Sequence, residues 1–199
     1  MSHRPHSHRA FREEAASIDW AGLWARQEAR SELAEPLFDL AAGRRLVDVG
    51  CGPGYFALRY QQLGADVLAV DLVEEALAFA RARGVRRTAR VDVEAEPLPE
   101  TGFDAALVTN VLHHARDPLA LLRHVRPSAP RVVVAEFDPE GPRDFGPPLE
   151  ERLSPAAVMQ LLRAAGYQPG ARIELGAEMY AIVGETTSSR SAEAAKEPK

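Results

Sequence analysis

A strand, a glycine-rich loop and a helix follow one another in the first third of this sequence. Residues 45–49 form a short apolar run typical of a buried strand, and residues 55–63 have helical spacing. Between them, Gly50, Gly52 and Gly54 alternate with other residues. Glycine lets a backbone turn sharply and approach a ligand closely, and a helix N-terminus presents free N–H groups. The unit predicts an α/β fold with a ligand at the carboxyl ends of parallel strands.

The following residues continue the alternation of strands and helices. Short apolar runs predict strands at residues 67–70, 89–91, 105–109 and 131–136. Periodic segments predict helices at residues 74–83, at 118–125 and from Ser154 to about 165. Such alternation predicts a doubly wound, mostly parallel sheet with helices on both faces.

Two further strand-like runs, residues 168–175 and 178–183, are joined by Gly176 and Ala177. Parallel neighbours need a crossover of roughly a dozen residues, so this short connection requires an antiparallel pair. We expect the sheet to end in an antiparallel hairpin.

The chain of 199 residues fits one domain, which we assign to residues 13–184. Residues 13–43 are its helical cap, and Pro36 predicts a kink or a break there. The basic segment 1–12 and the polar tail 185–199 are expected to be disordered. The alternative for segment 1–12 is a metal site at its three histidines, His3, His6 and His8.

Composition limits which cellular location, binding partners and metal sites are expected. No apolar run approaches the roughly eighteen residues of a membrane span, and no signal-peptide core is present, so we expect a cytoplasmic protein. A net charge of −5 argues against nucleic acid as the main partner. The single cysteine, Cys51, excludes an intrachain disulfide and a cysteine cluster for zinc. The oligomeric state stays open.

Two ligands compete for the glycine loop. Residues 52–57 satisfy the dinucleotide fingerprint G-x-G-x-x-A, and Asp71 follows about twenty residues later, as that fingerprint expects. With Asp48 and Gly50 in front, however, the loop becomes D-x-G-x-G-x-G. The longer pattern resembles that of class I S-adenosylmethionine-dependent methyltransferases.

The resemblance covers residues 46–185 and is strongest to the small-molecule methyltransferases related to ubiquinone and menaquinone biosynthesis. It implies a Rossmann-like sheet of seven strands. It also implies S-adenosylmethionine as cofactor, S-adenosylhomocysteine as product and a small-molecule methyl acceptor. The alternatives are a protein of this fold that binds the cofactor without turnover and an NAD(P)-binding oxidoreductase.

The resemblance also assigns a cofactor site, whose glycine-loop members contact the methionine part of the cofactor. These are Asp48, which orients the loop and the ammonium group, and Gly50, Cys51, Gly52 and Gly54.

The other members of this site follow later strands. Asp71 would bind the ribose hydroxyls and Leu72 the adenine face. Asp92 and the backbone of Val93 would bind the adenine edge, and Asn110 the methionine end. The alternatives are a helix cap for Asp71, a turn residue for Asp92, and a turn or cap for Asn110.

A catalytic base is needed only if the acceptor must lose a proton. The candidates are His113 and His114, with Glu136 and Asp138 at the next strand end, and none is singled out. The cap and the loop 137–153 would cover the acceptor pocket. Trp20, Trp24 and Phe145 could line it, although we expect the two tryptophans to be packing core.

Overall fold

The structure is a computed structural model that describes residues 18–41, 43–143 and 146–187. The predictions for residues 1–12 and 188–199, and that for Phe145, lie outside these residues. In the described part of the chain, no helix is long and apolar enough to cross a membrane.

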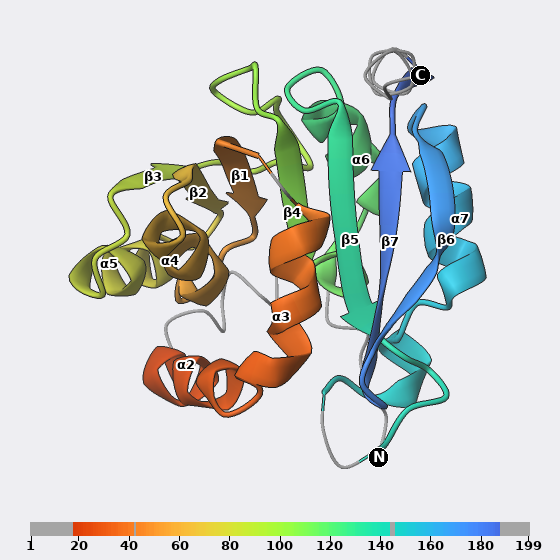
Figure 1. Cartoon of the computed structure of the whole chain (residues 1–199), viewed down its shortest axis with the longest axis horizontal. Coiled ribbons are helices and arrows are strands. Elements are labelled where there is room, and N and C mark those ends of the chain that lie inside the picture. Colours follow the sequence, from red (N-terminus) through yellow and green to blue (C-terminus); the bar gives the residue numbers. More distant parts are fainter. Residues whose placement is uncertain (1–17, 42, 144–145, 188–199) are drawn as a thin grey trace, which may run out of the picture.

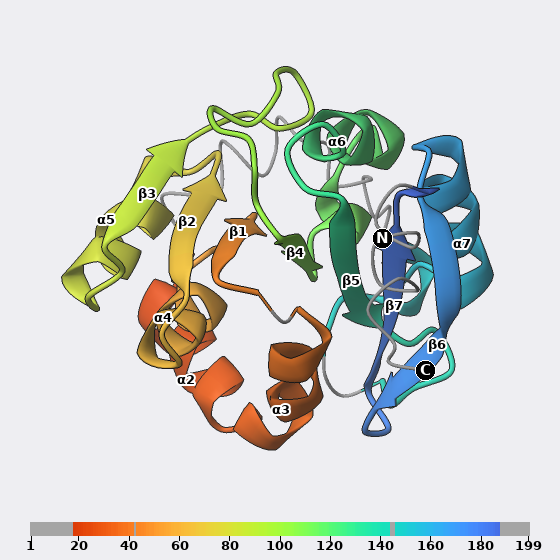
Figure 2. The same ribbon diagram turned by 45° about the horizontal axis from the view of Figure 1, so that its top comes forward.

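Seven strands form one sheet in the order β3-β2-β1-β4-β5-β7-β6 (Figures 1 and 2). β1 to β5 pair in parallel, whereas β7 is antiparallel to both β5 and β6. The strands are β1 Arg45–Val49, β2 Asp66–Asp71, β3 Arg87–Arg90, β4 Ala105–Thr109, β5 Arg131–Phe137, β6 Gln168–Leu175 and β7 Met179–Glu185. The predicted sheet and its closing antiparallel hairpin are confirmed.

Helices lie on both faces of the sheet, as predicted. α6 and α7 lie on one face, and α2, α3 and α4 on the other (Figure 2). The α-helices are α2 Trp20–Glu28, α3 Ser31–Leu40, α4 Tyr55–Gln62, α5 Glu74–Ala82, α6 Pro118–Val125 and α7 Pro155–Ala164, and the short 3-10 helices are η2 Leu112–His114 and η3 Leu149–Glu151.

Alternating side chains of the buried strands divide the core into two clusters. In β5, Val133 and Ala135 join the cluster that holds Leu77 of α5. Val132 and Val134 of the same strand join the cluster of α6 and α7. Because successive strand residues point to opposite faces, a run of apolar residues fills both layers at once.

The helical cap is two helices, but the break is not at Pro36. α2 ends before Ala29, whose N–H bonds Ala25, and Pro36 lies inside α3. A proline removes one hydrogen bond from a helix, and here tertiary contacts offset that loss. Leu37 is 1% exposed, and its carbonyl accepts a hydrogen bond from the Tyr60 hydroxyl.

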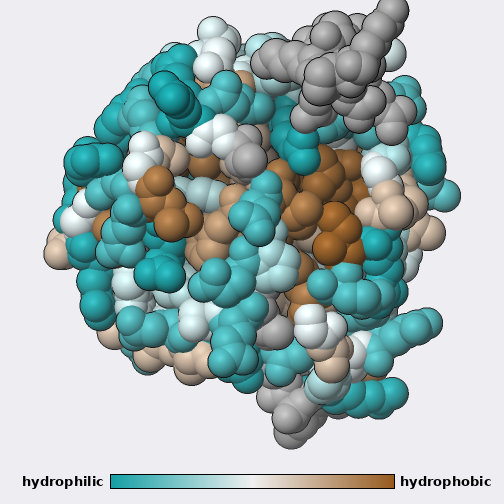
Figure 3. All heavy atoms as spheres, viewed as in Figure 1, coloured by the Kyte–Doolittle hydropathy of each residue, from teal (hydrophilic) through white to brown (hydrophobic). Residues whose placement is uncertain are grey.

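Apolar side chains are also visible on the outside of the sheet. Figure 3 shows them gathered over β7 and β6, where the described helices leave this face uncovered. Half-buried Ile173 and Val183 belong to these two strands and pack against the core cluster of that face. β7 also continues beyond the predicted end of the domain to Glu185, and the Thr186 N–H bonds the Pro130 carbonyl at 2.8 Å.

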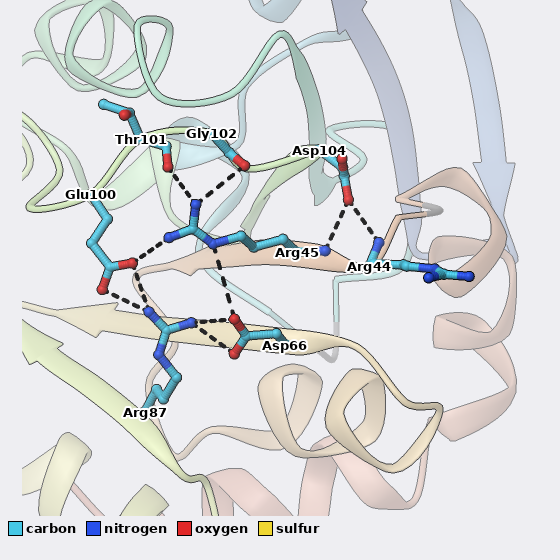
Figure 4. Close-up of polar contacts among 8 residues, drawn as sticks. All are labelled: Arg44, Arg45, Asp66, Arg87, Glu100, Thr101, Gly102 and Asp104. Atoms are coloured by element: carbon cyan, nitrogen blue, oxygen red, sulfur yellow. Dashed lines mark hydrogen bonds and ion pairs between the residues drawn. The ribbon is translucent and has the colours of Figure 1, made fainter.

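A charged cluster joins the amino ends of three parallel strands (Figure 4). Arg45, Asp66 and Arg87 are the first residues of β1, β2 and β3. Arg45 and Arg87 both donate to Glu100 at 2.6 Å, and Arg87 also bonds Asp66 at 2.7 Å. We call these four residues the amino-end cluster, which lies at the opposite ends of the strands from the glycine loop.

Candidate functional site

A cavity of about 770 Å³ opens at the carboxyl ends of the parallel strands. It lies where the strand order reverses, because β2 and β4 flank β1 on opposite sides. Such switch points are the usual ligand sites of open α/β sheets. The predicted residues that line it are Asp48, Gly50, Cys51, Gly52, Asp71, Leu72, Asp92, Val93, Asn110, His113 and His114.

Within the predicted cofactor site, Gly54 is the one residue that does not line the cavity. Its φ is +82°, and a Cβ there would stand 2.7 Å from the Cβ of Ala80 and 2.9 Å from a methyl of Val85. Glycine at this position allows the start of α4 to pack closely against α5 and the residues that follow α5. Gly54 is therefore placed at a packing contact, which the assignment of Gly54 to the cofactor site did not predict.

The glycine loop is fixed by backbone hydrogen bonds. The N–H groups of Gly50 and Cys51 both bond the Val70 carbonyl, at 2.8 and 3.0 Å. Gly50 has a φ of +68°, and a Cβ there would meet a Val111 methyl at 2.6 Å. At Gly52, with φ +52°, the nearest atom to an added Cβ is 3.9 Å away, on Leu23. Gly52 thus leaves open space on the cavity side.

Asp71 connects the glycine loop to β2. Its Oδ2 accepts the Gly52 N–H at 2.8 Å, and its Oδ1 accepts the Val73 N–H at 2.9 Å. Burial raises the pKa of this carboxyl, while these backbone donors lower it. Val73 is the N-cap of α5 and makes no side-chain cap hydrogen bond. Asp71 therefore orders the helix start and also lines the cavity. Each carboxylate oxygen can accept more than one hydrogen bond, so Asp71 can still accept from a ligand.

Asp48 is a buried carboxyl with an unsatisfied atom. Its side chain lines the cavity, and its Oδ2 has no hydrogen-bond partner in the described structure. Burial raises its pKa to about 7, a nearby Asp71 charge adds to this rise, and the Ala57 backbone opposes it. The neighbouring Cys51 thiol is also buried, and burial raises its pKa well above the usual value, so it is a poor nucleophile.

Asn110 follows β4 in a strained conformation. Its φ is +58°, which among the described residues makes it the only non-glycine with a positive φ. Non-glycine residues in this region cost free energy and cluster at functional sites. The Asn110 Oδ1 and the Oγ1 of the preceding Thr109 are both buried without a partner. Sequence reasoning missed Thr109, although a polar residue ending the buried apolar run of β4 was a usable signal.

Gln27 on α2 is a second residue that sequence reasoning missed. Its Oε1 is buried without a partner, and its side chain lines the cavity. Gln27 lies four residues after Leu23 and therefore on the same helix face. Asp48, Asn110 and Gln27 together offer unsatisfied oxygen acceptors to one cavity. A ligand group that donates several hydrogen bonds, such as an ammonium, would satisfy them.

The segment after β3 forms another wall. Asp92 and Val93 line the cavity beside Leu72. The carbonyl of Val93 bonds the Nδ1 of His124 at 2.8 Å, and that of Asp92 accepts the N–H groups of residues 95 and 96. Asp92 thus forms a turn, as its alternative assignment expected, and still lines the cavity. Leu72 is held through its carbonyl, which accepts from Arg90 at 3.1 Å.

His113 and Glu136 form a buried pair at the end of β5. The Nδ1 of His113 lies 2.5 Å from Oε2 of Glu136, and the two side chains are 2% and 1% exposed. Oε1 of Glu136 accepts the N–H groups of Val111 and Leu112 at 3.1 and 2.7 Å. The His113 ring lines the cavity, whereas Glu136 lies behind it. The His114 ring is 4.0 Å from that of His113 and also lines the cavity.

Asp138 is a base candidate that the structure places elsewhere. It does not line the cavity. Its Oδ2 pairs with Arg172 at 2.5 Å, and its Oδ1 accepts the Glu140 N–H at 2.9 Å. Asp138 therefore anchors the start of the loop after β5. Among the described residues, no group of three or more His, Cys, Asp or Glu side chains is placed to hold a metal ion.

The two tryptophans differ in role. Trp24 is 6% exposed and packs edge-on against Tyr55 at 5.5 Å between ring centres, so the core expectation is right for it. Trp20 lines the cavity, together with Ile18 and Leu23 of the cap. Across from them, Pro147 and Pro148 of the loop after β5 line the same cavity. Residues of the cap and of this loop therefore both line the cavity, and their covering of the acceptor stays a prediction.

Comparisons with known proteins agree with this geometry. Residues 47–127 match the family model of a methyltransferase domain. The chain is 34% identical over 107 residues to a ubiquinone biosynthesis O-methyltransferase of Bordetella avium, covering 51% of this chain and 44% of that protein. A protein of the same name from Ruegeria pomeroyi is 30% identical over 156 residues, covering 64% of this chain and 61% of its own length.

The fold is similar to that of solved methyltransferases. A SAM-dependent methyltransferase from Aquifex aeolicus superposes with a TM-score of 0.71 at 24% identity, covering 84% of this chain and 98% of its own. The chain spans about half the length of the curated relatives it matches. A shared fold at this identity does not fix a shared reaction.

Proposed function

We propose that this chain is an S-adenosylmethionine-dependent methyltransferase and that it transfers a methyl group from S-adenosylmethionine to a small-molecule acceptor. The observation that carries the proposal is the set of unsatisfied acceptors around the glycine loop, on Asp48, Asn110 and Gln27. An amino-acid ammonium is the ligand group that matches three such oxygens.

In this proposal, different residues of the chain bind different parts of the cofactor. Asp48 and Asn110 accept from its ammonium, and Asp71 accepts from its ribose hydroxyls with the lone pairs not used by the backbone. Gly52 makes room for it, since a side chain there would project into open space. Leu72 covers one face of its adenine, and the segment of Asp92 and Val93 borders the adenine edge.

When bound, S-adenosylmethionine supplies a methyl group on a sulfonium, which is already an activated leaving group. The protein must therefore mainly align the acceptor and exclude water, and good alignment alone lowers a barrier by about 7 kcal/mol or more. Trp20 and Leu23 of the cap and Phe137 at the end of β5 give the cavity apolar walls. A dry site favours a reaction in which positive charge disappears.

An oxygen acceptor on an apolar body fits best. The relatives named above are O-methyltransferases. Apolar side chains, Leu37, Phe56 and Met179 among them, make up much of the cavity lining. We therefore propose a phenol or enol as the acceptor class.

The test is a methyl-transfer assay with methyl-labelled S-adenosylmethionine and a panel of catechols, hydroxybenzoates, aliphatic amines and thiols. We expect label in at least one phenolic product, detected by mass spectrometry. Asp48→Asn should reduce the rate, and Asp39→Asn, at an exposed site on α3, should not. If the protein binds S-adenosylhomocysteine but labels only amines or thiols, the oxygen-acceptor proposal is wrong. If it labels nothing, the turnover proposal is wrong.

A further inference from the structure

The carboxylate of Glu136 is fully occupied by this chain and faces no open space. One oxygen accepts two backbone N–H groups, and the other lies 2.5 Å from His113 Nδ1. An ionised carboxylate can only accept hydrogen bonds, so the second oxygen of Glu136 accepts from the histidine ring. Nδ1 therefore carries a proton, and Nε2, on the other side of the ring, is the nitrogen that remains for a ligand.

We propose that Glu136 is a positioning residue that fixes His113 in the Nδ1–H tautomer, so that Nε2 takes the proton of the acceptor hydroxyl. This inference rests on the proposed function. The acceptor oxygen gains the methyl carbon as its O–H bond breaks. The carbon–sulfur bond breaks with its electron pair on sulfur, and the proton stays on Nε2. The resulting imidazolium is stabilised by the buried Glu136 carboxylate until solvent removes the proton.

The position of the pair suits this role. His113 lines the same cavity as Asn110 and Phe137, and its ring packs edge-on to Phe137 at 6.2 Å between centres. Its side chain is 2% exposed, so the ring is screened from bulk water. A base that is buried, oriented by a second group and directed at a ligand cavity is the usual arrangement in general base catalysis.

The conservative variant Glu136→Gln makes a specific prediction. The N–H groups of Val111 and Leu112 need an acceptor where Oε1 stands, so the amide oxygen must take that place. The amide NH₂ then faces His113, and because it can only donate, Nδ1 must accept. The ring proton moves to Nε2, and the cavity loses its base while the residue volume hardly changes.

The experiment is ¹⁵N NMR of the full chain with labelled histidine, in the wild type and in Glu136→Gln, with His113→Asn to identify the signal. Glu75→Gln, at an exposed site on α5, is the matched control. We expect His113 to carry its proton on Nδ1 in the wild type and in the control, and on Nε2 in Glu136→Gln. A wild-type ring protonated on Nε2, or on both nitrogens at pH 8, would overturn the proposal.

Measurements of turnover and of ligand affinity distinguish a failure of this inference from a failure of the proposed function on which it rests. With a phenolic acceptor from the assay above, Glu136→Gln should lower kcat by a factor of about a hundred, which is typical for loss of a general base. KM and the affinity for S-adenosylhomocysteine should stay within a factor of about two. If the variant has the inverted tautomer but an unchanged kcat, His113 is not the general base. A wild type that does not bind S-adenosylhomocysteine contradicts the proposed function instead.

Discussion

At the scale of single residues, the most informative group is Asp48, a carboxyl that is buried without a full set of partners. Its pKa of about 7 is raised above the ordinary 3.8, chiefly by burial. A folded pKa above the unfolded one means that the folded protein binds more protons between these values. The stability of the ligand-free protein should therefore fall as pH rises from about 4 to 7 and level off above that range.

Replacing Asp48 with asparagine should remove this dependence. At pH 8 we expect Asp48→Asn to unfold at a higher urea concentration than the wild type, and at pH 4 the two should be equal. Urea denaturation followed by circular dichroism at the two pH values measures this. A variant that is less stable than the wild type at pH 8 would contradict the assigned cost of the buried charge.

Binding should respond in the opposite direction. If the ionised Asp48 holds the cofactor ammonium, the affinity for S-adenosylhomocysteine should rise about tenfold from pH 6 to pH 8, because the carboxyl must lose its proton to bind. Asp48→Asn should bind more weakly at pH 8 and should flatten the dependence. An equally steep dependence in the variant would show that another group titrates.

At the scale of elements, the glycine loop packs against neighbouring elements as well as lining the cavity. Gly54 and Gly64 both have positive φ values, +82° and +96°, but only at Gly54 would a methyl group collide with a neighbouring element. Gly64→Ala should lose roughly 1–2 kcal/mol through backbone strain alone. Gly54→Ala should lose roughly 1–3 kcal/mol more through overpacking of α4 against Ala80 and Val85. Equal losses, measured by urea denaturation, would contradict the packing role.

The amino-end cluster provides a second element-scale test. Hydrogen bonds from Arg87, and then Arg45, lower the pKa of Glu100 below its ordinary 4.5. A lowered pKa stabilises the fold above the unfolded pKa, and the contribution is lost as pH falls through the folded value. Because these side chains are about one-third exposed, Glu100→Gln should cost only about 0.5–1 kcal/mol at pH 7.

This cost should shrink as pH falls below about 4.5, and the affinity for S-adenosylhomocysteine should not change, because the cluster lies at the far ends of the strands from the cavity. Glu96→Gln, at an exposed site in the same connection between β3 and β4, is the matched control. An equal loss for both variants would show that Glu100 has no special contribution.

At the scale of the whole molecule, most of the sheet could be predicted because its strands are buried on both faces. Such strands are continuous apolar runs, and β1 and β4 begin and end as predicted. β3 begins two residues earlier than predicted, at Arg87. It is an edge strand with half-exposed, charged residues, so it lacks the apolar signal. A kink or a break in the cap was predicted at Pro36, because proline disfavours the interior of a helix. Tertiary packing instead keeps Pro36 inside α3, and α2 ends earlier, at Glu28.

The site could be predicted only in part. Residues directly after the parallel strands could be predicted to lie around one cavity, because parallel strands bring their carboxyl ends together. The partnership of His113 with Glu136 could not be found, since the two lie 23 residues apart and only the pairing of β4 with β5 brings them into contact. Gln27 could not be assigned either, because the angle at which α2 covers the sheet is a property of the packed molecule.

The central claim is that this cavity binds S-adenosylmethionine and not a dinucleotide, although the loop also satisfies the dinucleotide fingerprint. Calorimetric titration with S-adenosylhomocysteine and with NADH tests it directly, in the wild type, Asp71→Ala and Asp39→Ala. We predict that the wild type and Asp39→Ala bind S-adenosylhomocysteine. Asp71→Ala should bind it at least about ten times more weakly, through loss of a charge-assisted contact worth roughly 1.5–3 kcal/mol. Absence of S-adenosylhomocysteine binding, or tighter binding of NADH, would contradict the account.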